Sequence, residues 1–530
     1  MPRLPAAAAL LAALLSQPLP GQSAPDSSRR IQAVEVRRHN VFGPGEANSF
    51  VTRLANSLHA TTRAYVVQRE ILVRPGDPYD SAAVQETARN LRALGLFRRV
   101  TVDSFRNDSG LVVRFVTGDG WSMRPMWGWS NVGDKRNTLL GIADNNVLGT
   151  GNYLALRFQW TPDRSAVTAQ FRAPRLLPGR IGLTLQHQDR SDGSLQFAAL
   201  SKPFYTLTDP LSWSLALDTR RNRILRFFQG SDEARDSLQR RYTLGVGSAA
   251  VALKASPRRY LRLGVMGQVR RDDYAAEAAV DTIGRTVTGA AGVFLQWRRI
   301  QFLVSTGLQG FGREEDVDLG TAIGVGLNVT PRAFGYREDG IVPAVGIRAG
   351  IGRVDRFLQL FANASGRLTS AGLDSGSVHL AATGYLQPWQ GHLVVVHGAH
   401  GWQRRAAPGA EFDLGLGLGP RGYRQHSFTG DRAFFTMAEY RYTLSEEFLK
   451  LSAIGLAGFV EYGGAWYKGD QRRTGWDAGV GLRFGITRSP TIRTTRLDVL
   501  YRSSTGADKG GWTYSLGLGF PFSSTGRLDP

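Results

Sequence analysis

Cysteine is absent from this 530-residue sequence. Its absence excludes disulfides, thiolate nucleophiles and cysteine-ligated metal sites, and it fits an exported protein that needs no covalent cross-links. Long apolar runs are also absent beyond the first residues, so no transmembrane helix, which needs about 20 apolar residues, is expected. This does not exclude a membrane, because strands of a membrane barrel need only about 9–11 residues and present one polar face.

Lysine is scarce. Only six of the 65 basic residues are lysine, although the formal net charge is +21. Such a charge can indicate nucleic-acid binding. The arginines, however, are scattered through alternating segments and are not gathered in a basic arm. We therefore expect no nucleic-acid partner, and we assign these arginines to a barrel lumen or to the headgroup level of an anionic membrane.

Short segments of alternating polarity follow one another from about Trp121 to Phe522. In Asn152–Trp160, for example, Leu154 and Leu156 would share one face of a strand and Arg157 the opposite face. A strand turns successive side chains to opposite sides, so this period separates an apolar surface from a polar one. The sequence therefore predicts an all-β transmembrane barrel over residues 121–522.

The N-terminus has the composition of a secretion signal. Arg3 supplies a positive charge, Ala6–Leu15 is apolar but too short to span a bilayer, and Gly21 and Ser23 are small residues near a cleavage site. We expect Met1–Ala24 to be a signal peptide that directs export.

Residues 27–118 have a different pattern and predict a small α+β domain. Its expected order is β-α-α-β-β, with Thr62 capping the first helix, Asp80 or Ser81 capping the second, and an additional helix near Phe50–Leu58. The expected strands are Ile31–Val41, Val100–Phe105 and Leu111–Val116.

This order resembles a POTRA domain, the periplasmic module of the BamA/TamA outer-membrane assembly family. The residues that carry the resemblance are Thr62–Val73, Gly76–Asp80, Leu94–Phe97 and Val100–Val102. BamA-type members carry several POTRA domains, whereas this sequence has one convincing copy, and residues 40–60 depart from the usual pattern.

The C-terminal part extends the resemblance. Asp144–Gly151, with Asn146, Gly149 and Gly151, looks like the family's first periplasmic turn, in which glycines allow a tight hairpin. Lys202–Tyr205 resembles a later periplasmic turn. The resemblance implies about 16 antiparallel strands, which the roughly 400 residues available can supply.

The most specific stretch is Leu418–Arg424, which resembles the family's long sixth extracellular loop. In the family this loop folds back into the lumen, and its arginine pairs with an acid on each of the next two strands. The resemblance therefore implies that Arg421 pairs with Glu439 and Glu461, where the family usually has aspartate at the second position. Gly422 would let the loop turn sharply and Tyr423 would pack against the wall. The alternative is that these are ordinary lumen charges.

Two other motifs are rejected. Gly417–Gly422 matches G-x-G-x-x-G, but a dinucleotide site needs this motif between a strand and a helix, and strand-like sequence follows here. His392 and His397 would point to opposite faces of a strand, so metal binding with His400 is not expected. We expect no catalytic, cofactor or metal residues and no enzymatic activity.

The predicted protein is a BamA/TamA-like barrel in the outer membrane of a Gram-negative-type bacterium, with its N-terminal domain in the periplasm. It would assist insertion or translocation of envelope proteins. Expected partners are outer-membrane lipid, unfolded outer-membrane or secreted clients and accessory envelope proteins. A dedicated two-partner-type secretion pore and a passive porin-like barrel are the alternatives. Ser523–Pro530 would be a C-terminal tail after the last strand.

Overall fold

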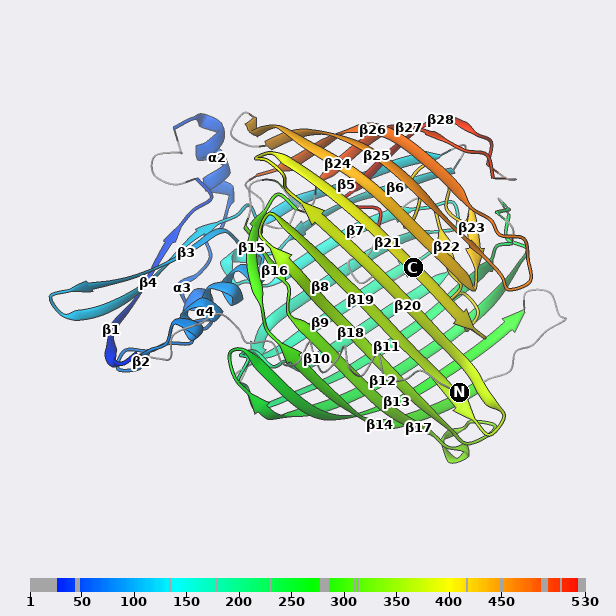
Figure 1. The fold of residues 1–530 in the computed structure, drawn as a ribbon, viewed down its shortest axis with the longest axis horizontal. Helices are drawn as coiled ribbons and strands as arrows, with labels where there is room; N and C mark the ends of the chain where they lie inside the picture. Colours follow the sequence, from blue (N-terminus) through cyan, green and yellow to red (C-terminus); the bar gives the residue numbers. More distant parts are fainter. Residues whose placement is uncertain are drawn as a thin grey trace.

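The chain is arranged as a small α/β domain that lies against one end of a large β-barrel (Figure 1). We call the barrel rim next to this domain the proximal rim and the opposite one the distal rim. The expected signal peptide, Met1–Ala24, and the expected tail, Ser523–Pro530, lie outside the described residues. The computed structural model describes residues 26–42, 48–132, 135–177, 180–228, 230–231, 233–276, 286–308, 311, 314–415, 418–448, 452–487, 494–505 and 508–522.

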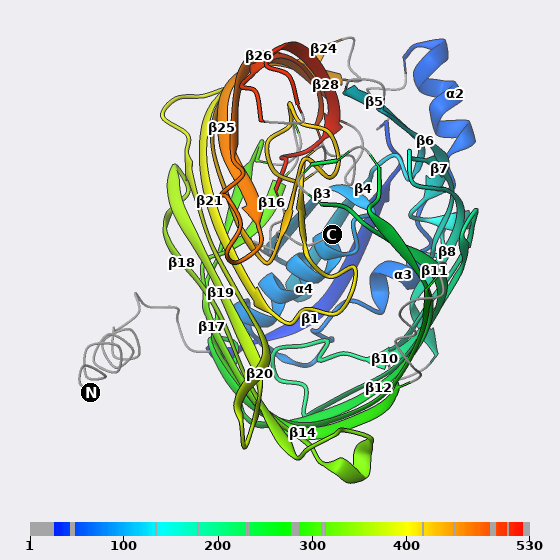
Figure 2. The same ribbon diagram turned by 90° about the vertical axis from the view of Figure 1, so that its right-hand side faces the viewer.

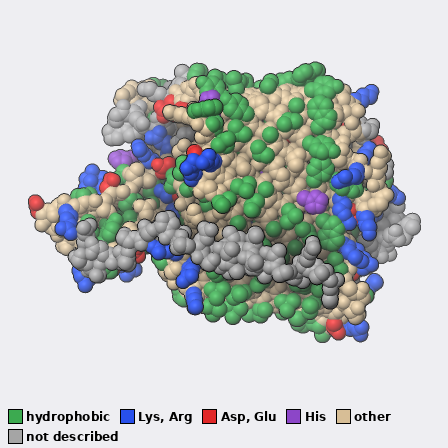
Figure 3. Space-filling view, in the orientation of Figure 1, with side chains coloured by type: hydrophobic (Ala, Val, Ile, Leu, Met, Phe, Trp, Pro, Cys, Tyr) green, Lys and Arg blue, Asp and Glu red, His purple; other side chains and the backbone are tan. Residues whose placement is uncertain are grey.

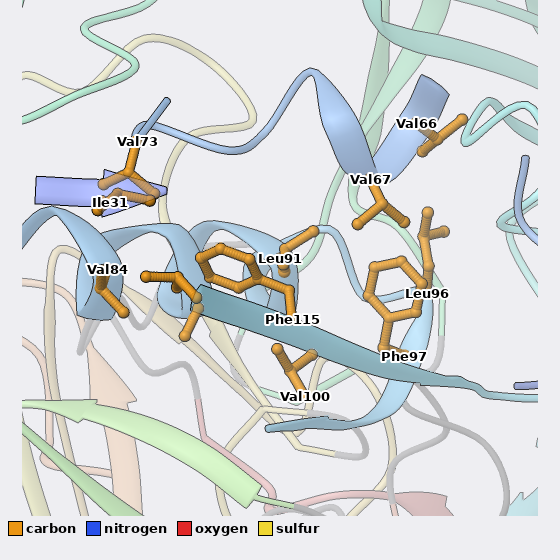
Figure 4. Close-up of a cluster of buried hydrophobic side chains, with 12 residues drawn as sticks. Ile31, Val66, Val67, Val73, Val84, Leu91, Leu96, Phe97, Val100 and Phe115 are labelled. Atoms are coloured by element: carbon orange, nitrogen blue, oxygen red, sulfur yellow. The ribbon is translucent and has the colours of Figure 1, made fainter. Parts of the chain in front are cut away.

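The N-terminal domain is a four-stranded sheet with the order β2-β1-β4-β3, in which β1 and β4 are parallel. The buried side chains of Val67, Leu91 and Phe115 form part of its core (Figure 4). The observed order contains the predicted β-α-α-β-β arrangement with one additional helix, and it adds the two-residue strand β2, which was not predicted. Its elements are β1 (Asp26–His39), α2 (Phe50–Leu58), α3 (Ala64–Gln68), β2 (Pro78–Tyr79), α4 (Ser81–Ala93), β3 (Phe97–Asn107) and β4 (Gly110–Asp119).

One of the two predicted helix caps is wrong. Asp80 does cap α4, because its carboxylate accepts a hydrogen bond from the Ala82 N–H. Thr62 does not cap α3: the helix begins at Ala64, and the Thr62 N–H and hydroxyl both donate to the Asp119 carboxylate at the end of β4. Thr62 therefore ties the start of α3 to the sheet, and α3 covers only Ala64–Gln68 of the POTRA-resembling stretch Thr62–Val73.

In the described residues, twenty strands form the closed barrel, which closes where β28 meets β5. Strands next to each other in the chain pair antiparallel, as in β11 with β12. The barrel strands are β5 (Met123–Val132), β6 (Lys135–Asp144), β7 (Tyr153–Trp160), β8 (Ser165–Leu177), β9 (Ile181–Arg190), β10 (Gly193–Lys202), β11 (Leu211–Arg226), β12 (Asp236–Ala255), β13 (Arg259–Ala276), β14 (Thr286–Arg299), β17 (Thr321–Thr330), β18 (Gly340–Arg353), β19 (Arg356–Thr369), β20 (Gly372–Leu386), β21 (His392–Arg404), β24 (Arg432–Phe448), β25 (Ser452–Trp466), β26 (Gly475–Ile486), β27 (Thr495–Arg502) and β28 (Gly511–Leu518).

The fold class is confirmed, but the expected number of about 16 strands is wrong. Connections on the proximal rim are as short as Val354–Asp355. The roughly 400 residues of the barrel therefore hold more strands than the 16 that were expected. The stretch Leu418–Arg424, which resembles the family's sixth extracellular loop, lies between β21 and β24. This connection is the eighth on the distal rim and not the sixth. We call residues 405–431 the Arg421 loop; it contains the hairpin β22 (Phe412–Leu414) and β23 (Phe428–Gly430).

A second hairpin lies on the proximal side. It consists of β15 (Phe302–Thr306) and β16 (Glu314–Asp318), between barrel strands β14 and β17. Two 3-10 turns, η1 (Val147–Gly149) and η2 (Arg332–Phe334), complete the elements of the described residues.

The barrel wall has the predicted alternation. Leu154, Leu156 and Phe158 of β7 are 49%, 52% and 43% exposed, whereas Ala155 between them is buried. Figure 3 shows hydrophobic side chains spread over the barrel wall. A soluble surface rarely exposes so continuous an apolar area, so the outward face suits hydrocarbon. None of the helices in the described residues is long and apolar enough to cross a membrane.

Candidate functional site

The Arg421 loop lies inside the barrel. In Figure 2 the yellow and orange segment that contains it sits within the ring of strands. Its apolar side chains Phe412, Leu414 and Phe428 are fully buried and pack on Phe435 and Met437 of β24. This burial fixes the loop against the inner wall and places residues 418–424 among lumen-facing charges.

Arg421 pairs with three carboxylates. Its Nη2 donates to Glu439 Oε2 at 2.8 Å and to Glu461 Oε1 at 2.6 Å, and its Nη1 donates to Asp498 Oδ2 at 2.9 Å. All four side chains have no exposed surface. The guanidinium also lies over the Phe459 ring, 3.8 Å from its centroid. The predicted pairing of Arg421 with Glu439 and Glu461 is present, and Asp498 is a third partner that the sequence did not predict.

The buried network extends beyond Arg421. Arg483 joins Glu439 at 3.1 Å to Asp498 at 2.6 Å, and Arg441 donates to Glu439 at 2.5 Å. With Arg496 and Asp477, four arginines and four acids gather on β24–β27 and the loop tip. Buried charges are costly unless each is compensated, and here each of Glu439, Glu461 and Asp498 has at least one arginine partner.

Gly422 is required for a different reason than predicted. We expected it to allow a sharp turn, yet its φ is outside the left-handed region. A Cβ at this position would lie 2.5 Å from Leu500 Cδ1 and 2.9 Å from Asp477 Oδ2. Its N–H also donates to Asp477 at 2.8 Å. The loop therefore approaches β26 and β27 so closely that no side chain fits.

Tyr423 anchors the loop tip to the wall, as predicted. The ring is fully buried against Phe428. Its hydroxyl lies 2.9 Å from the carbonyl oxygens of Trp476 and Ser503. The tyrosine thus joins the loop to β26 and to the connection that precedes β28.

His426 ties the same loop to the distal rim. Its ring nitrogens lie 2.5 Å from Asp413 Oδ2 and 2.9 Å from Asp163 Oδ2, and Asp163 belongs to the connection between β7 and β8. Burial lowers the pKa of His426, but the hydrogen bonds with Asp163 and Asp413 outweigh it and raise the pKa to about 9. At neutral pH the protonated ring therefore links two carboxylates.

The end of the described chain also turns into the lumen. Phe522 stacks on His397 of β21 at 3.9 Å between ring centroids, and Arg441 lies 3.9 Å from the Phe520 ring centroid. Between them, the Pro521 carbonyl accepts a hydrogen bond from the Gly419 N–H. The segment after β28 thus touches the Arg421 loop. This contact connects the last strand of the barrel to the charged network in the lumen.

The predicted turn at Asn146, Gly149 and Gly151 docks on the N-terminal domain. Asn146 Nδ2 donates to Thr62 Oγ1 at 2.8 Å, and the Gly149 carbonyl accepts from the Arg63 N–H at 2.9 Å. Gly149 and Gly151 have φ of 73° and 72°, and a Cβ on Gly149 would lie 2.5 Å from the Thr61 carbonyl oxygen. The glycines therefore serve both the tight turn and this close contact.

Further connections on the proximal rim hold the same domain. The Tyr205 hydroxyl donates to Glu70, which also pairs with Arg175 at 3.2 Å. Arg92 of α4 binds Asp316 of the β15–β16 hairpin through two hydrogen bonds of 2.8 and 2.9 Å. The N-terminal domain is thus fastened across the proximal mouth by several separate contacts.

The histidines of β21 do not converge. His397 is buried and hydrogen-bonded to Thr383 at 2.8 Å, whereas His400 is exposed. No group of three or more metal-ligating side chains occurs in the described part of the chain. The G-x-G-x-x-G stretch includes Gly417, which lies outside the described residues.

Sequence reasoning missed Asp498, Arg483 and Arg441. A usable signal existed: in Arg496–Tyr501 the apolar Leu497 and Val499 alternate with charged residues. The charged positions of strands that follow the loop point inward, so each was a candidate for the network.

The N-terminal domain matches a known family. A family model for the POTRA domain, described as surface antigen variable number repeat, matches residues 58–118. A search of curated proteins finds no match. Among solved structures, BamA from Haemophilus ducreyi lacking POTRA domains 1–3 is 12% identical, with 93% of this chain and 86% of that chain covered and a TM-score of 0.37. CdiB from Escherichia coli is 11% identical, with coverages of 93% and 77% and a TM-score of 0.46.

At such identities and TM-scores, these two structures say nothing about the chemistry of this chain. The POTRA match covers the helices and strands from the end of α2 to β4, and the closed barrel follows directly. The chain therefore carries a POTRA-like domain directly ahead of a closed β-barrel.

Proposed function

We propose that this protein lies in the outer membrane, with its POTRA domain in the periplasm, and assists the insertion or translocation of other envelope proteins. The observation that carries the proposal is the fastening of a POTRA domain to the proximal mouth of a barrel with a short closing seam. A passive pore needs neither feature.

The POTRA sheet has edges that suit an unfolded client. β3 forms one edge, and β2 pairs with β1 at the other edge only over Asp26–Arg30. An extended polypeptide can add to such an edge through main-chain hydrogen bonds, largely independent of its side chains. The domain would hold the client beside the barrel mouth.

The seam between β5 and β28 would then receive client strands. β28 has 8 residues, so the seam can pair at most 8 positions, the number paired between β27 and β28 and half of the 16 paired between β11 and β12. Breaking ladder hydrogen bonds in lipid is costly because water cannot replace them. A short seam lowers that cost, and the free edges could pair with a client strand.

The Arg421 network would brace the barrel wall while the seam between β5 and β28 opens. Its acids lie on β24–β27, the four strands that precede β28, while the lumen that a porin needs open is occupied by the loop. Translocation of a whole client through the lumen would require this loop to move. The arrangement therefore favours insertion at the seam over a dedicated secretion pore.

Depleting the protein and comparing the outer-membrane proteome tests the proposal. Broad loss of barrel proteins is the expected result. Loss of one secreted protein would indicate dedicated export, and an unchanged proteome would indicate a passive barrel. Both of these results contradict the proposed insertion role.

A further inference from the structure

The β15–β16 hairpin is a long insertion on the proximal rim, and it lies within the ring of barrel strands (Figure 2). It belongs to the connection at residues 300–320, whereas the next proximal connection along the chain is the short turn Val354–Asp355. The hairpin is therefore an addition to the barrel and not a simple turn between two strands.

One face of the hairpin is apolar and packs on the inner wall. Val317 of β16 is buried in one cluster with Phe357 of β19 and Val395 of β21. The approach is close, because a Cβ on Gly350 of β18 would lie 2.5 Å from the Cα of Leu319, which directly follows β16. The interior of a membrane barrel is usually polar, so this apolar area of the wall matches the hairpin.

The opposite face of the hairpin is polar and meets α4 of the POTRA domain loosely. Asp316 pairs with Arg92 at 2.8 Å, and the two side chains are 18% and 15% exposed. Arg89 lies 5.2 Å from the centroid of the Phe302 ring. A pocket of about 730 Å³ lies between this face and α4. The contact with the POTRA domain therefore depends on partly exposed charges more than on packing.

The two faces differ in what would break their contacts. Buried apolar packing stabilises in proportion to the area removed from water. A partly exposed ion pair contributes little and is screened by salt. If the POTRA domain moves away from the proximal mouth, the hairpin is therefore expected to remain on the wall.

The hairpin also contacts the segment that follows β28. Phe520 and Phe522 pack against the same apolar cluster that contains Leu308. Arg441 of β24 joins the two, because its guanidinium lies 3.9 Å from the Phe520 ring centroid and its Nη1 donates to the Leu308 carbonyl at 3.5 Å. The hairpin thus helps to hold this segment in the lumen.

We propose that the β15–β16 hairpin is a lid that belongs to the barrel and not to the POTRA domain. It stays on β19–β21 when the POTRA domain leaves the proximal mouth, and the two part at the Arg92–Asp316 pair. The lid keeps the segment after β28 in place, so that release of this segment needs a second, separate step. The inference goes beyond the proposed function, because it concerns the protein without a client.

Distances between spin labels on the purified protein in lipid nanodiscs test which side the hairpin follows. Because the chain has no cysteine, one pair of labels can be placed at the exposed Val304 and Gln85, on the hairpin and α4. A second pair at Val304 and Leu360 reports on the hairpin and the outer face of β19. Arg92→Glu sets two negative charges against each other, so the α4–hairpin distribution should become at least about twofold broader while the hairpin–wall distribution stays unchanged.

Arg106→Glu, the same charge change at an exposed position of β3, is the matched control and should alter neither distribution. A broader hairpin–wall distribution in Arg92→Glu would overturn the proposal, because the hairpin would then follow the POTRA domain. No change in either distribution, or equal broadening in the control, would overturn it as well, because the pair would not be the joint.

Proteolysis tests the hold on the segment after β28. Chymotrypsin can cut after Phe522, and the intact mass reports the loss of residues 523–530. Val317→Asp places an unpaired carboxylate on the buried face of the hairpin, so it should speed this cleavage at least about 10-fold. Val304→Asp, on the exposed face of the same hairpin, is the matched control and should leave the rate unchanged.

Equal rates in all three proteins, or equal acceleration by both variants, would refute the hold on this segment. Heat-modifiable migration identifies the variants that fold. If Val317→Asp does not fold, Val317→Ala leaves a cavity at the same site and should act in the same direction. Both measurements use the protein without clients, so their failure leaves the proteome result untouched and the two proposals can fail separately.

Discussion

Replacing Arg421 with methionine tests the buried network most sharply. The side chain makes four hydrogen bonds to Glu439, Glu461 and Asp498. Without it, Glu439 still has Arg441 and Arg483, and Asp498 still has Arg483. Among the described residues, Glu461 has no ion-pair partner other than Arg421 and therefore loses it. The cluster is then left with one uncompensated buried acid.

Breaking a buried ion pair on one side costs about 3–5 kcal/mol, whereas replacing both partners with apolar groups is often close to neutral. We therefore expect Arg421→Met to lower the free energy of unfolding by about 3–5 kcal/mol. The double variant with Glu461→Met should recover at least about half of that loss, because no charge is then left unpaired.

The assay is urea unfolding of the barrel in lipid vesicles, followed by tryptophan fluorescence and by heat-modifiable migration on gels. Arg348→Met on β18, which three strands separate from β24, serves as the control for loss of an arginine. A loss below about 1 kcal/mol in the single variant, the range of an exposed pair, would refute the reasoning. A double variant no more stable than the single would refute it as well.

Three further predictions follow from the site. Gly422→Ala should destabilise the barrel by about 1–3 kcal/mol through overpacking against Leu500, measured by the same unfolding assay; an unchanged midpoint would contradict the close approach. The His426 contribution should be fully present below pH 6.5 and lost as pH rises through about 9, because its pKa is raised on folding; thermal unfolding between pH 6 and 10 should show this step in the native protein and not in His426→Gln. Asn146→Ala should loosen the POTRA domain by removing the contact with Thr62, seen as faster proteolysis between β4 and β5, and an unchanged rate would contradict a role of this contact.

The sequence was sufficient where a local pattern decides the structure. Alternation along Asn152–Trp160 predicted which side chains face lipid, and Asp80 was identified as a cap because its position before an amphipathic helix is a local signal. The pairing of Arg421 with Glu439 and Glu461 came from the family resemblance and not from spacing.

Other features depend on contacts between distant parts of the chain. Asp498 lies 77 positions after Arg421, and nothing local marks it as a third partner. Thr62 was interpreted as a cap because its tertiary partner, Asp119, is 57 positions away. The predicted number of strands was too low, because tight connections such as Val354–Asp355 cannot be distinguished by composition from the strands around them.

The central claim is that client strands enter at the seam between β5 and β28. Because the chain has no cysteine, single cysteines placed in Met123–Trp127 and in Gly511–Gly517 can be joined without competing thiols. Oxidation should stop insertion of client barrels by the double-cysteine variant, and reduction should restore it. If the locked protein inserts clients as well as the reduced one, the seam is not the route and the account is contradicted.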